Sequence, residues 1–290
     1  MHTIAARVLA WYADAERPLP WRASGTTPWG VYVSEIMAQQ TQIARVAEAW
    51  EQWIERWPTP SALAAASPAD VVRQWAGLGY PRRALWMHAA AVRMVEAHGG
   101  AVPSTDADLR ALPGVGEYTA AAVRAFAFGQ RVPVLDVNVR RVHARVFDGA
   151  VGAGSSITAA ERAHHDSFLP DDAAVAARLS QAVMELGAVV CVARAPRCDV
   201  CPIADRCRWR ALGHPVATAP SVRRQPRFAG SDRQCRGALM RVLRDAPGAV
   251  SASALEAAWA DAMQRARCLD GLVRDGLVVP LARGRFALPR

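Results

Sequence analysis

The chain has 290 residues, 52% of them hydrophobic, which is enough for one large or two modest domains with buried cores. No stretch approaches the roughly 18 to 20 apolar residues that span a membrane, and the N-terminus lacks the apolar core of a secretory signal. We therefore expect a soluble cytoplasmic protein that binds no membrane. The formal charge of +9 favours a polyanionic partner, and because every basic residue is arginine, no lysine amine can form a Schiff base with a sugar.

The N-terminal residues predict an amphipathic helix followed by a loop that prolines enforce. The apolar residues at helical spacing are Ile4, Val8, Leu9 and Trp11. Pro18 and Pro20 then forbid helix continuation and leave Trp21 and Arg22 on an ordered loop. From the sequence of this loop alone, Trp21 can either pack in the hydrophobic core or line a binding site.

A second helix is expected over residues 28–42 and carries Glu35 among apolar neighbours. Partial burial would raise the pKa of Glu35, so that it keeps a proton near neutral pH as a general acid must. A solvated glutamate on a helix face is the alternative. Gln39, Gln40 and Gln42 follow on the same helix and suit hydrogen bonds to bases or backbone, although glutamines are also ordinary helix formers.

Residues 43–57 predict a tryptophan-rich helix packed in the core. The sequence QWAGLGY, which ends at Tyr80, predicts a helix end and a glycine turn. The turn places Tyr80 at its tip, where the ring can wedge into a base stack or cap a core. Another helix is expected from Pro81 to about Ala97.

The sequence LPGVGEYT at residues 112–119 predicts a tight hairpin before a helix. Gly114 and Gly116 permit positive φ and close backbone approach, and the N–H groups at the start of the next helix can hold a phosphate. Twenty residues beyond Gly116, Asp136 lies in an apolar run, two residues before Asn138. This combination indicates chemistry on a nucleotide. A helix–turn–helix in which Asp136 is only an N-cap is the alternative.

Two helices are expected at about 157–168 and 173–188, the second with Gln181 and Glu185 one turn apart. Four of the six cysteines then follow with the spacing Cys-x6-Cys-x2-Cys-x5-Cys. Four thiolates so close in sequence can bind a [4Fe–4S] cluster or a tetrahedral zinc ion, and nearby arginines suit a phosphate backbone. The predicted metal ligands are Cys191, Cys198, Cys201 and Cys207.

Residues 213–232 carry prolines and arginines without apolar periodicity and predict a linker. Residues 233–290 predict a small winged-helix-like module of mixed α and β structure. Arg265 and Arg267 on its third helix are either DNA contacts or solvated side chains. The expected elements are helices near 233–245, 252–260 and 262–275 and two strands around a turn, at 272–279 and 284–288.

The motifs, taken in this order, resemble those of MutY-type adenine DNA glycosylases, in the helix–hairpin–helix superfamily typified by endonuclease III. The resemblance spans residues 5 to 210 and rests on LPWR to Arg22, SEIMAQQTQ to Gln42, GLGY to Tyr80, the hairpin, LDVNVRR to Arg141 and the four-cysteine loop. It implies an all-α fold of two subdomains with the active site in the cleft between them. One is a six-helix barrel of residues 20–130 with the hairpin, and the other comprises residues 1–19 and 131–212 with the cluster.

The resemblance further implies a monomer that flips adenine out of duplex DNA, where it is mispaired with 8-oxoguanine or guanine, and hydrolyses its glycosidic bond. It implies a [4Fe–4S] cluster on the four cysteines and a monovalent cation at the hairpin. Glu35 matches the acid that protonates adenine N7, and Asp136 matches the carboxylate that stabilises the oxocarbenium-like sugar. Tyr118 and Asn138 match residues that position this pair, and the adenine pocket is matched by Trp21, Arg22 and Gln181. The residues that match those contacting the opposite base are Gln40, Thr41, Leu78 and Tyr80. The hairpin residues Gly114, Val115 and Gly116 match a phosphate-binding site.

Bifunctional relatives carry a catalytic lysine at the position of Tyr118, so the tyrosine predicts a monofunctional glycosylase. A thymine–guanine mismatch glycosylase is the nearest alternative, and Glu35 with the glutamine-rich run favours adenine over it. The presence of both Glu35 and Asp136 argues against a DNA-binding scaffold without catalysis. The sequence departs from the family at Ala38, where leucine is usual, and in a tail too short for the NUDIX-like domain that reads 8-oxoguanine in many relatives.

Overall fold

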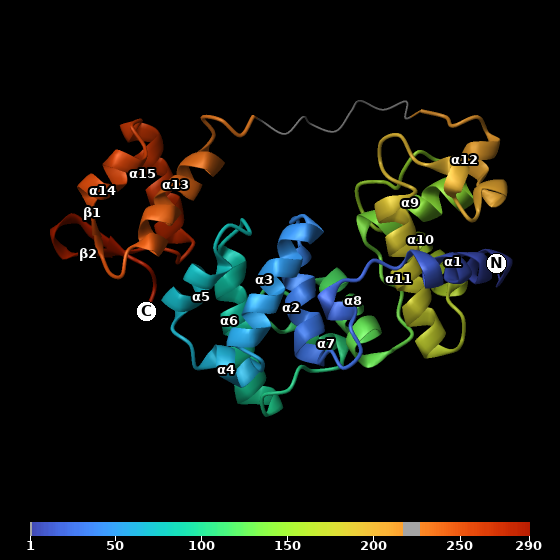
Figure 1. Ribbon diagram of the computed structural model, residues 1–290, viewed down its shortest axis with the longest axis horizontal. Helices are drawn as coiled ribbons and strands as arrows, with labels where there is room; N and C mark the ends of the chain where they lie inside the picture. Colours follow the sequence, from blue (N-terminus) through green and yellow to red (C-terminus); the bar gives the residue numbers. More distant parts are fainter. Residues whose placement is uncertain (1, 217–226) are drawn as a thin grey trace. The chain divides into compact units, whose positions relative to one another are not determined.

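The computed structural model describes residues 2–216 and 227–290, so the part of the predicted linker at 217–226 lies outside the described residues. The described chain is almost entirely helical, with one small sheet near its C-terminus (Figure 1). This confirms the expected all-α fold with a small α+β module. The chain forms two compact units, of residues 2–31, 104–110 and 115–216, and of residues 32–103, 111–114 and 227–290. The subdomain boundaries expected from the resemblance stay a prediction.

The first unit is a helical bundle built around α11. Val8 and Tyr12 of α1 and Val139 and Val142 of α9 share its core with Leu179 and Leu186 of α11, and all of these side chains are buried. The helices of this unit are α1 (His2–Ala15), α7 (Asp106–Arg110), α8 (Glu117–Phe128), α9 (Val137–His143), α10 (Ala159–Phe168), α11 (Ala173–Val189) and α12 (Arg208–Ala211).

The second unit has the tryptophan-rich core that the sequence predicted. The ring of Trp53 makes edge contacts with Trp57 and Trp75 at centroid distances of 4.7 and 5.6 Å. Thr59 and Ser67 cap the two short helices, each accepting from a backbone N–H three residues on. The second unit begins within α2 (Pro28–Ala38) and therefore contains the greater part of that helix. Its other helices before the C-terminal module are α3 (Ile43–Arg56), α4 (Pro60–Ala64), α5 (Pro68–Trp75) and α6 (Arg82–His98).

The helix that carries Glu35 is shorter than predicted. α2 ends at Ala38, and Gln40 has a φ of +56°, in the left-handed region where a right-handed helix cannot continue. The prediction that the glutamines at 39–42 lie on this helix is therefore wrong. Their helix propensity is overridden because Arg83 of α6 binds the last carbonyls of α2 and fixes the turn that follows.

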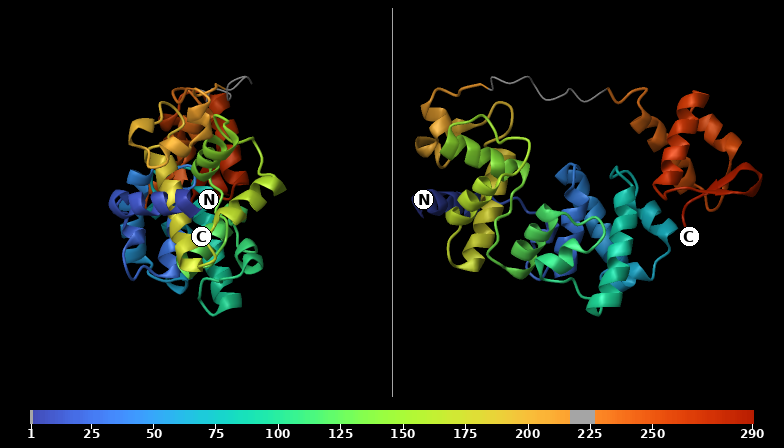
Figure 2. Two further views of the ribbon diagram at one scale, coloured as in Figure 1. Left: turned by 90° about the vertical axis from the view of Figure 1, so that its right-hand side faces the viewer. Right: turned by 180° about the vertical axis from the view of Figure 1, so that it is seen from behind.

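The C-terminal module has three helices as predicted, followed by two strands that form a wing (Figure 2). The sheet is antiparallel with the strand order β1-β3-β2. The predicted strand at 272–279 is wrong because Leu272 is a buried residue of α15, and the strand begins only after Gly276 turns the chain at φ +74°. The sequence also missed β1. The elements are α13 (Asp232–Asp245), β1 (Val250–Ser251), α14 (Ala252–Ala258), α15 (Ala262–Arg274), β2 (Val279–Leu281) and β3 (Arg285–Ala287).

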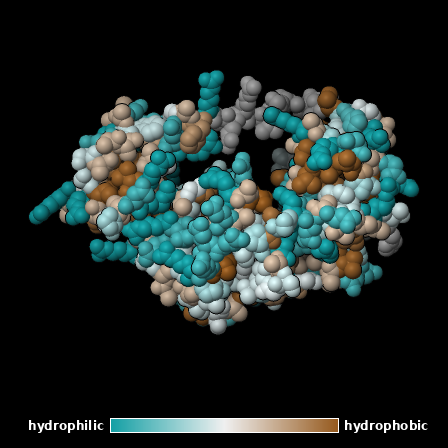
Figure 3. All heavy atoms as spheres, in the orientation of Figure 1, coloured by the Kyte–Doolittle hydropathy of each residue, from teal (hydrophilic) through white to brown (hydrophobic). Residues whose placement is uncertain are grey.

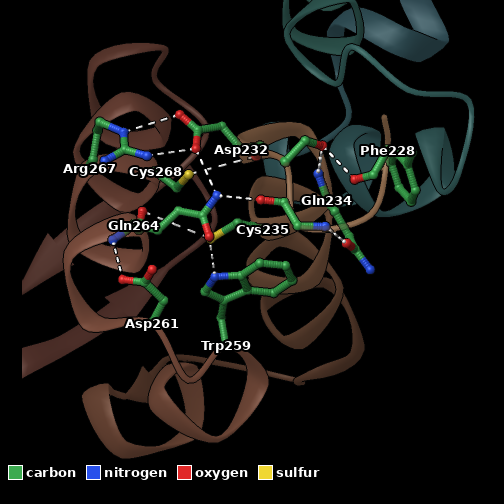
Figure 4. A network of polar contacts seen from close by, with 11 residues as sticks. Phe228, Asp232, Gln234, Cys235, Trp259, Asp261, Gln264, Arg267 and Cys268 are labelled. Atoms are coloured by element: carbon green, nitrogen blue, oxygen red, sulfur yellow. Dashed lines mark hydrogen bonds and ion pairs between the residues drawn. The ribbon is translucent and has the colours of Figure 1, made fainter. Parts of the chain in front are cut away.

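Polar contacts within the module occupy the arginines that were candidates for DNA contact. Arg267 pairs with Asp232 at 2.8 Å, and Gln264 donates to the same carboxylate at 2.9 Å (Figure 4). Arg265 donates to the carbonyl of Trp259 at 2.6 Å. Gln264 and Arg267 join α15 to α13, and Arg265 joins α15 to the end of α14, so these side chains hold the module together.

In the described part of the chain, no helix has the length and apolar character needed to cross a membrane. Hydrophilic side chains cover much of the face in Figure 3, with hydrophobic residues in separate patches.

Candidate functional site

Asp136 is the N-cap of α9 and is half-buried. Its Oδ1 accepts from the backbone N–H of Val139 at 2.6 Å, and its Oδ2 accepts from the side-chain amide of Asn138 at 2.7 Å. Burial raises the pKa of Asp136, and the hydrogen bonds from Val139 and Asn138 offset only part of that effect. Asp136 is thus both the N-cap that the alternative interpretation proposed and a desolvated carboxylate in a fixed orientation.

A chain of hydrogen bonds runs from this carboxylate to the cysteine loop. Arg141 donates to Oδ1 of Asn138 at 2.8 Å and to the carbonyl of Cys191 at 2.8 Å. Arg145, which is almost fully buried, donates to Sγ of Cys191 at 3.3 Å. Two arginines one helical turn apart therefore connect the first predicted metal ligand to the residue that orients Asp136.

Gly187 of α11 lets α9 approach closely enough for these bonds. A Cβ at position 187 would lie 2.7 Å from Cβ of Asn138 and 2.8 Å from its carbonyl oxygen. The carbonyl of Gly187 also accepts from Arg141 at 2.6 Å. Only glycine gives this backbone contact without moving the first turn of α9.

Tyr118 lies in the second position of α8 and packs on a small apolar cluster that includes Val132 and Val134. Val134 precedes Asp136 by two residues, so the packing brings α8 and the segment leading to Asp136 together. This placement is compatible with the positioning role that the resemblance assigns to Tyr118, and that role stays a prediction.

A buried carboxylate with two arginines lies beside the predicted adenine-pocket residues. Glu185 is fully buried, and its carboxylate accepts from Arg22 at 2.9 Å. Arg17 donates to both oxygens of the same carboxylate through two of its nitrogens. Burial alone would raise the pKa of Glu185, but the hydrogen bonds and charges of Arg17 and Arg22 outweigh it and lower the pKa. The ion pairs fix the 17–22 loop, which carries Trp21, against α11 one turn from Gln181.

Glu35 lies on α2 in the other unit, between the buried residues Ser34 and Ile36, and is itself half-buried. This is the environment that the sequence predicted. Ala38, the departure from the family, is the last residue of the same helix and is also half-buried.

Of the two hairpin glycines, Gly114 has the expected geometry, whereas Gly116 is extended at φ −95° and a Cβ there would meet nothing within 4 Å. Gly114 has a φ of +80°, and a Cβ there would lie 3.0 Å from Cβ of Trp86. Val115 is buried, and Gly116 is the N-cap of α8 without a side-chain cap. Because the N-cap glycine has no side chain that could cap the first turn of α8, this helix N-terminus suits a phosphate.

The residues predicted to meet the opposite base lie on two loops joined by Arg83. Its guanidinium donates to the carbonyl of Gln39 at 2.5 Å, to Oγ1 of Thr41 at 3.0 Å and to the carbonyl of Gly79 at 3.1 Å. Burial lowers the pKa of Arg83 to about 10. Tyr80 is exposed at the loop tip, with the Arg83 guanidinium 5.5 Å from its ring centroid, which suits a wedge.

Gln40 and Leu78 differ in exposure on these loops. Gln40 is exposed in its left-handed turn, whereas Leu78 is buried. The backbone carbonyl of Leu78 accepts from Oγ1 of Thr41 at 3.1 Å, so the two loops are bonded directly to each other.

The four cysteines line one cavity, together with Arg145 and Trp209. All four are half-buried free thiols. Four sulfur donors around a cavity, with Arg145 donating to one of them, fit a negatively charged iron–sulfur cluster.

Sequence reasoning missed the arginines that organise the site, which are the buried Arg83 and Arg145 and the half-buried Arg141. In a chain whose basic residues are all arginine, such side chains do not stand out from a solvated basic surface. Their only sequence signal is a position within apolar helical stretches.

Two segments of the chain match known families. Residues 33–151 match the HhH-GPD superfamily of base excision DNA repair proteins, and residues 191–207 match the iron-sulfur binding domain of endonuclease III. The second match includes all four cysteines and resolves the choice between zinc and iron–sulfur that their spacing left open.

Adenine DNA glycosylases are similar to this chain over nearly its whole length. That of Mycobacterium tuberculosis (strain ATCC 25618 / H37Rv) is 48% identical over 289 residues, which are 99% of this chain and 94% of the relative. That of Mycolicibacterium smegmatis is 49% identical over 97% of this chain and 94% of its own length. The human adenine DNA glycosylase is 41% identical over 70% of this chain and 38% of its own length.

Solved structures agree on the fold. A thermostable thymine-DNA glycosylase has a TM-score of 0.65 and 23% identity over 73% of this chain and 96% of its own. Endonuclease III in a non-covalent complex with DNA has a TM-score of 0.62 and 20% identity over 73% of this chain and 95% of its own. At these identities the likeness concerns the fold alone.

Proposed function

This chain belongs to the adenine DNA glycosylases, base excision repair enzymes with the HhH-GPD fold and an iron–sulfur domain, and we propose that it removes adenine mispaired with 8-oxoguanine or guanine. The substrate is DNA, and we propose that the adenine leaves the stack before the glycosidic bond is cleaved. Flipping costs a few kcal/mol and is easiest at a mispair.

The observation that carries the proposed mechanism is the fixed carboxylate of Asp136. Both oxygens accept hydrogen bonds, and α9 directs its N-terminus at the carboxylate. A helix N-terminus stabilises the ionised form, while burial strengthens the field that the carboxylate exerts. We assign Asp136 to the stabilisation of the positive charge that develops on the sugar, directly or through a short-lived bond.

We assign Glu35 to the protonation of adenine N7, which converts the base into a better leaving group. Its half-buried position on α2 between the buried residues Ser34 and Ile36 supports this role. Two carboxyl groups in different environments, one an acid and one an ionised stabiliser, are the usual arrangement for glycosidic cleavage. Tyr118 and Asn138 are assigned to positioning, and the Asn138 contact of 2.7 Å with Asp136 supports its share.

We propose that Trp21, Arg22 and Gln181 contact the flipped adenine. The ion pair between Arg22 and the buried Glu185 supports a rigid pocket wall, because it fixes the 17–22 loop before any substrate arrives. Gly114 to Gly116 would hold a phosphate, with a monovalent cation as the bridging ion. Gln40, Thr41, Leu78 and Tyr80 would meet the base opposite adenine.

We propose a monofunctional reaction that ends with an abasic site. The sequence contains no lysine, and Tyr118 stands where the bifunctional relatives have one. An enzyme without a lysine amine lacks the usual nucleophile for Schiff-base formation and strand cleavage. The protein should therefore nick its product strand only after alkali treatment.

Single-turnover kinetics on a duplex with one A:8-oxoguanine mispair test the assigned roles. Asp136→Asn and Glu35→Gln should each slow adenine release by about 100-fold or more. Asp172→Asn is the matched control, because Asp172 caps α11 through the same contact with a backbone N–H, at 2.9 Å. A near wild-type rate in Asp136→Asn would reduce Asp136 to a helix cap and refute the assignment.

A further inference from the structure

The loop that carries Leu78 and Tyr80 has an unusual backbone. Ala76 has a φ of +44° and Tyr80 a φ of +48°, on either side of Gly79 at +82°. Non-glycine residues in this region cost on the order of 1 kcal/mol each, so the surroundings must hold the loop in place.

Side chains from the helices around the loop supply most of that support. The carbonyl of Gly79 accepts from Trp75 at 2.9 Å and from Arg83 at 3.1 Å. The carbonyl of Leu78 accepts from Thr41, and that of Gly77 accepts from Arg45. Three consecutive carbonyls are thus bound by side chains of three helices and of the neighbouring 39–42 loop.

The fourth carbonyl, that of Ala76, is bound from the C-terminal module. Arg244 of α13 donates to it at 2.5 Å, across 168 residues of sequence. Arg244 is half-buried, and burial lowers the pKa of its guanidinium. A hydrogen bond from a charged donor is among the stronger ones in proteins.

Further contacts hold α13 and α15 in this position. Arg73 of α5 donates to the carbonyl of Ala246, directly after α13, at 3.4 Å. Asp275, directly after α15, lies 3.5 Å from Arg82 of α6 and also binds Arg236 of α13. The module is therefore joined both to the helix that precedes the loop and to the helix that follows it.

We propose that the C-terminal module sets the preference for the base opposite adenine by positioning the 76–80 loop through Arg244, without reading that base itself. The inference rests on the proposed function, because it concerns which mispair is cleaved faster. Arg244 is a positioning residue: it holds the strained end of the loop whose tip carries Tyr80. This gives the C-terminal module a role in recognition although Arg265 and Arg267 of α15 are engaged within the module.

The test compares the full-length protein with Arg244→Ala, Arg244→Lys and the control Arg241→Ala, which changes an exposed arginine on the same helix. The first measurement is the ratio of single-turnover rates for adenine opposite 8-oxoguanine and opposite guanine. The second is amide hydrogen exchange of Ala76 and Leu78, whose N–H groups bond to the carbonyls of Arg73 and Trp75.

Arg244→Ala should lower the rate ratio by about 5-fold and speed exchange at both amides, since one charge-assisted hydrogen bond is lost. Arg244→Lys should recover part of both effects, because its amine can still donate to the carbonyl, and Arg241→Ala should match the wild type. An unchanged ratio, an equal loss on both mispairs, or unchanged exchange would each overturn the inference. A wild-type protein that releases no adenine would instead overturn the proposed function, before any variant is compared.

Discussion

Replacing Gly187 by alanine should disable the enzyme through one misplaced helix turn. The new Cβ would stand 2.7 Å from Cβ of Asn138, whereas ordinary contact begins at 3.4 Å, so α9 must retreat by about 0.7 Å. Such overpacking costs about 1 to 3 kcal/mol. The same shift moves Asp136, and a displacement near 1 Å at a reacting group can cost about 100-fold in rate.

We therefore expect Gly187→Ala to slow adenine release by about 10- to 100-fold while the protein keeps its iron–sulfur absorbance. Gly237→Ala is the matched control, since Gly237 lies within α13 and a Cβ there would meet nothing within 4 Å. The control should keep the wild-type rate and gain about 0.5 to 1 kcal/mol of stability. A wild-type rate in Gly187→Ala would refute the argument that the close approach of α9 and α11 positions Asp136.

Three further predictions follow from buried charges. Arg141→Gln removes the donor to Oδ1 of Asn138 and one of the two donors to the carbonyl of Cys191, the other being Arg145. The free energy of unfolding should fall by about 1 to 3 kcal/mol, and the single-turnover rate should fall with it. An unchanged rate would show that Arg141 does not contribute to positioning Asp136. Glu185→Gln leaves Arg17 and Arg22 beside a neutral group, so the free energy of unfolding measured by chemical denaturation should fall by about 3 to 5 kcal/mol. A loss below about 1 kcal/mol would show that the ion pairs of Glu185 are not buried in solution. Burial lowers the pKa of His165 to about 4, so the folded state binds fewer protons than the unfolded state below pH 6.5, and stability should fall as pH drops from 6.5 towards 4. His165→Phe, which preserves the 3.5 Å stack on His143, should flatten that decline, and an unchanged pH profile would count against it.

The sequence predicted local chemistry well where a short spacing determines it. The cysteine loop, the glycine hairpin and the helices around Gln181 and Glu185 depend on residues near one another in the chain, so the pattern contains the information. The N-cap at Asp136 was also visible, because capping is local.

What the sequence missed depends on contacts between distant segments. Arg83 lies 44 to 47 residues beyond the carbonyls that it binds at the end of α2, and these bonds explain why glutamines with good helix propensity lie on a turn. The sequence around Leu272 is compatible with a strand or a helix, and burial of Leu272 within the module stabilises the helix. Gly187 looks like an ordinary helix glycine until α9 is seen against it.

The most direct test of the proposed activity is base release by the wild-type protein from four duplexes that carry A:8-oxoguanine, A:G, T:G and A:T, each with and without alkali. We predict adenine loss from the first two duplexes only, with strand breaks appearing only after alkali. Release of thymine from T:G, or strand breaks without alkali, would contradict the assignment of a monofunctional adenine glycosylase.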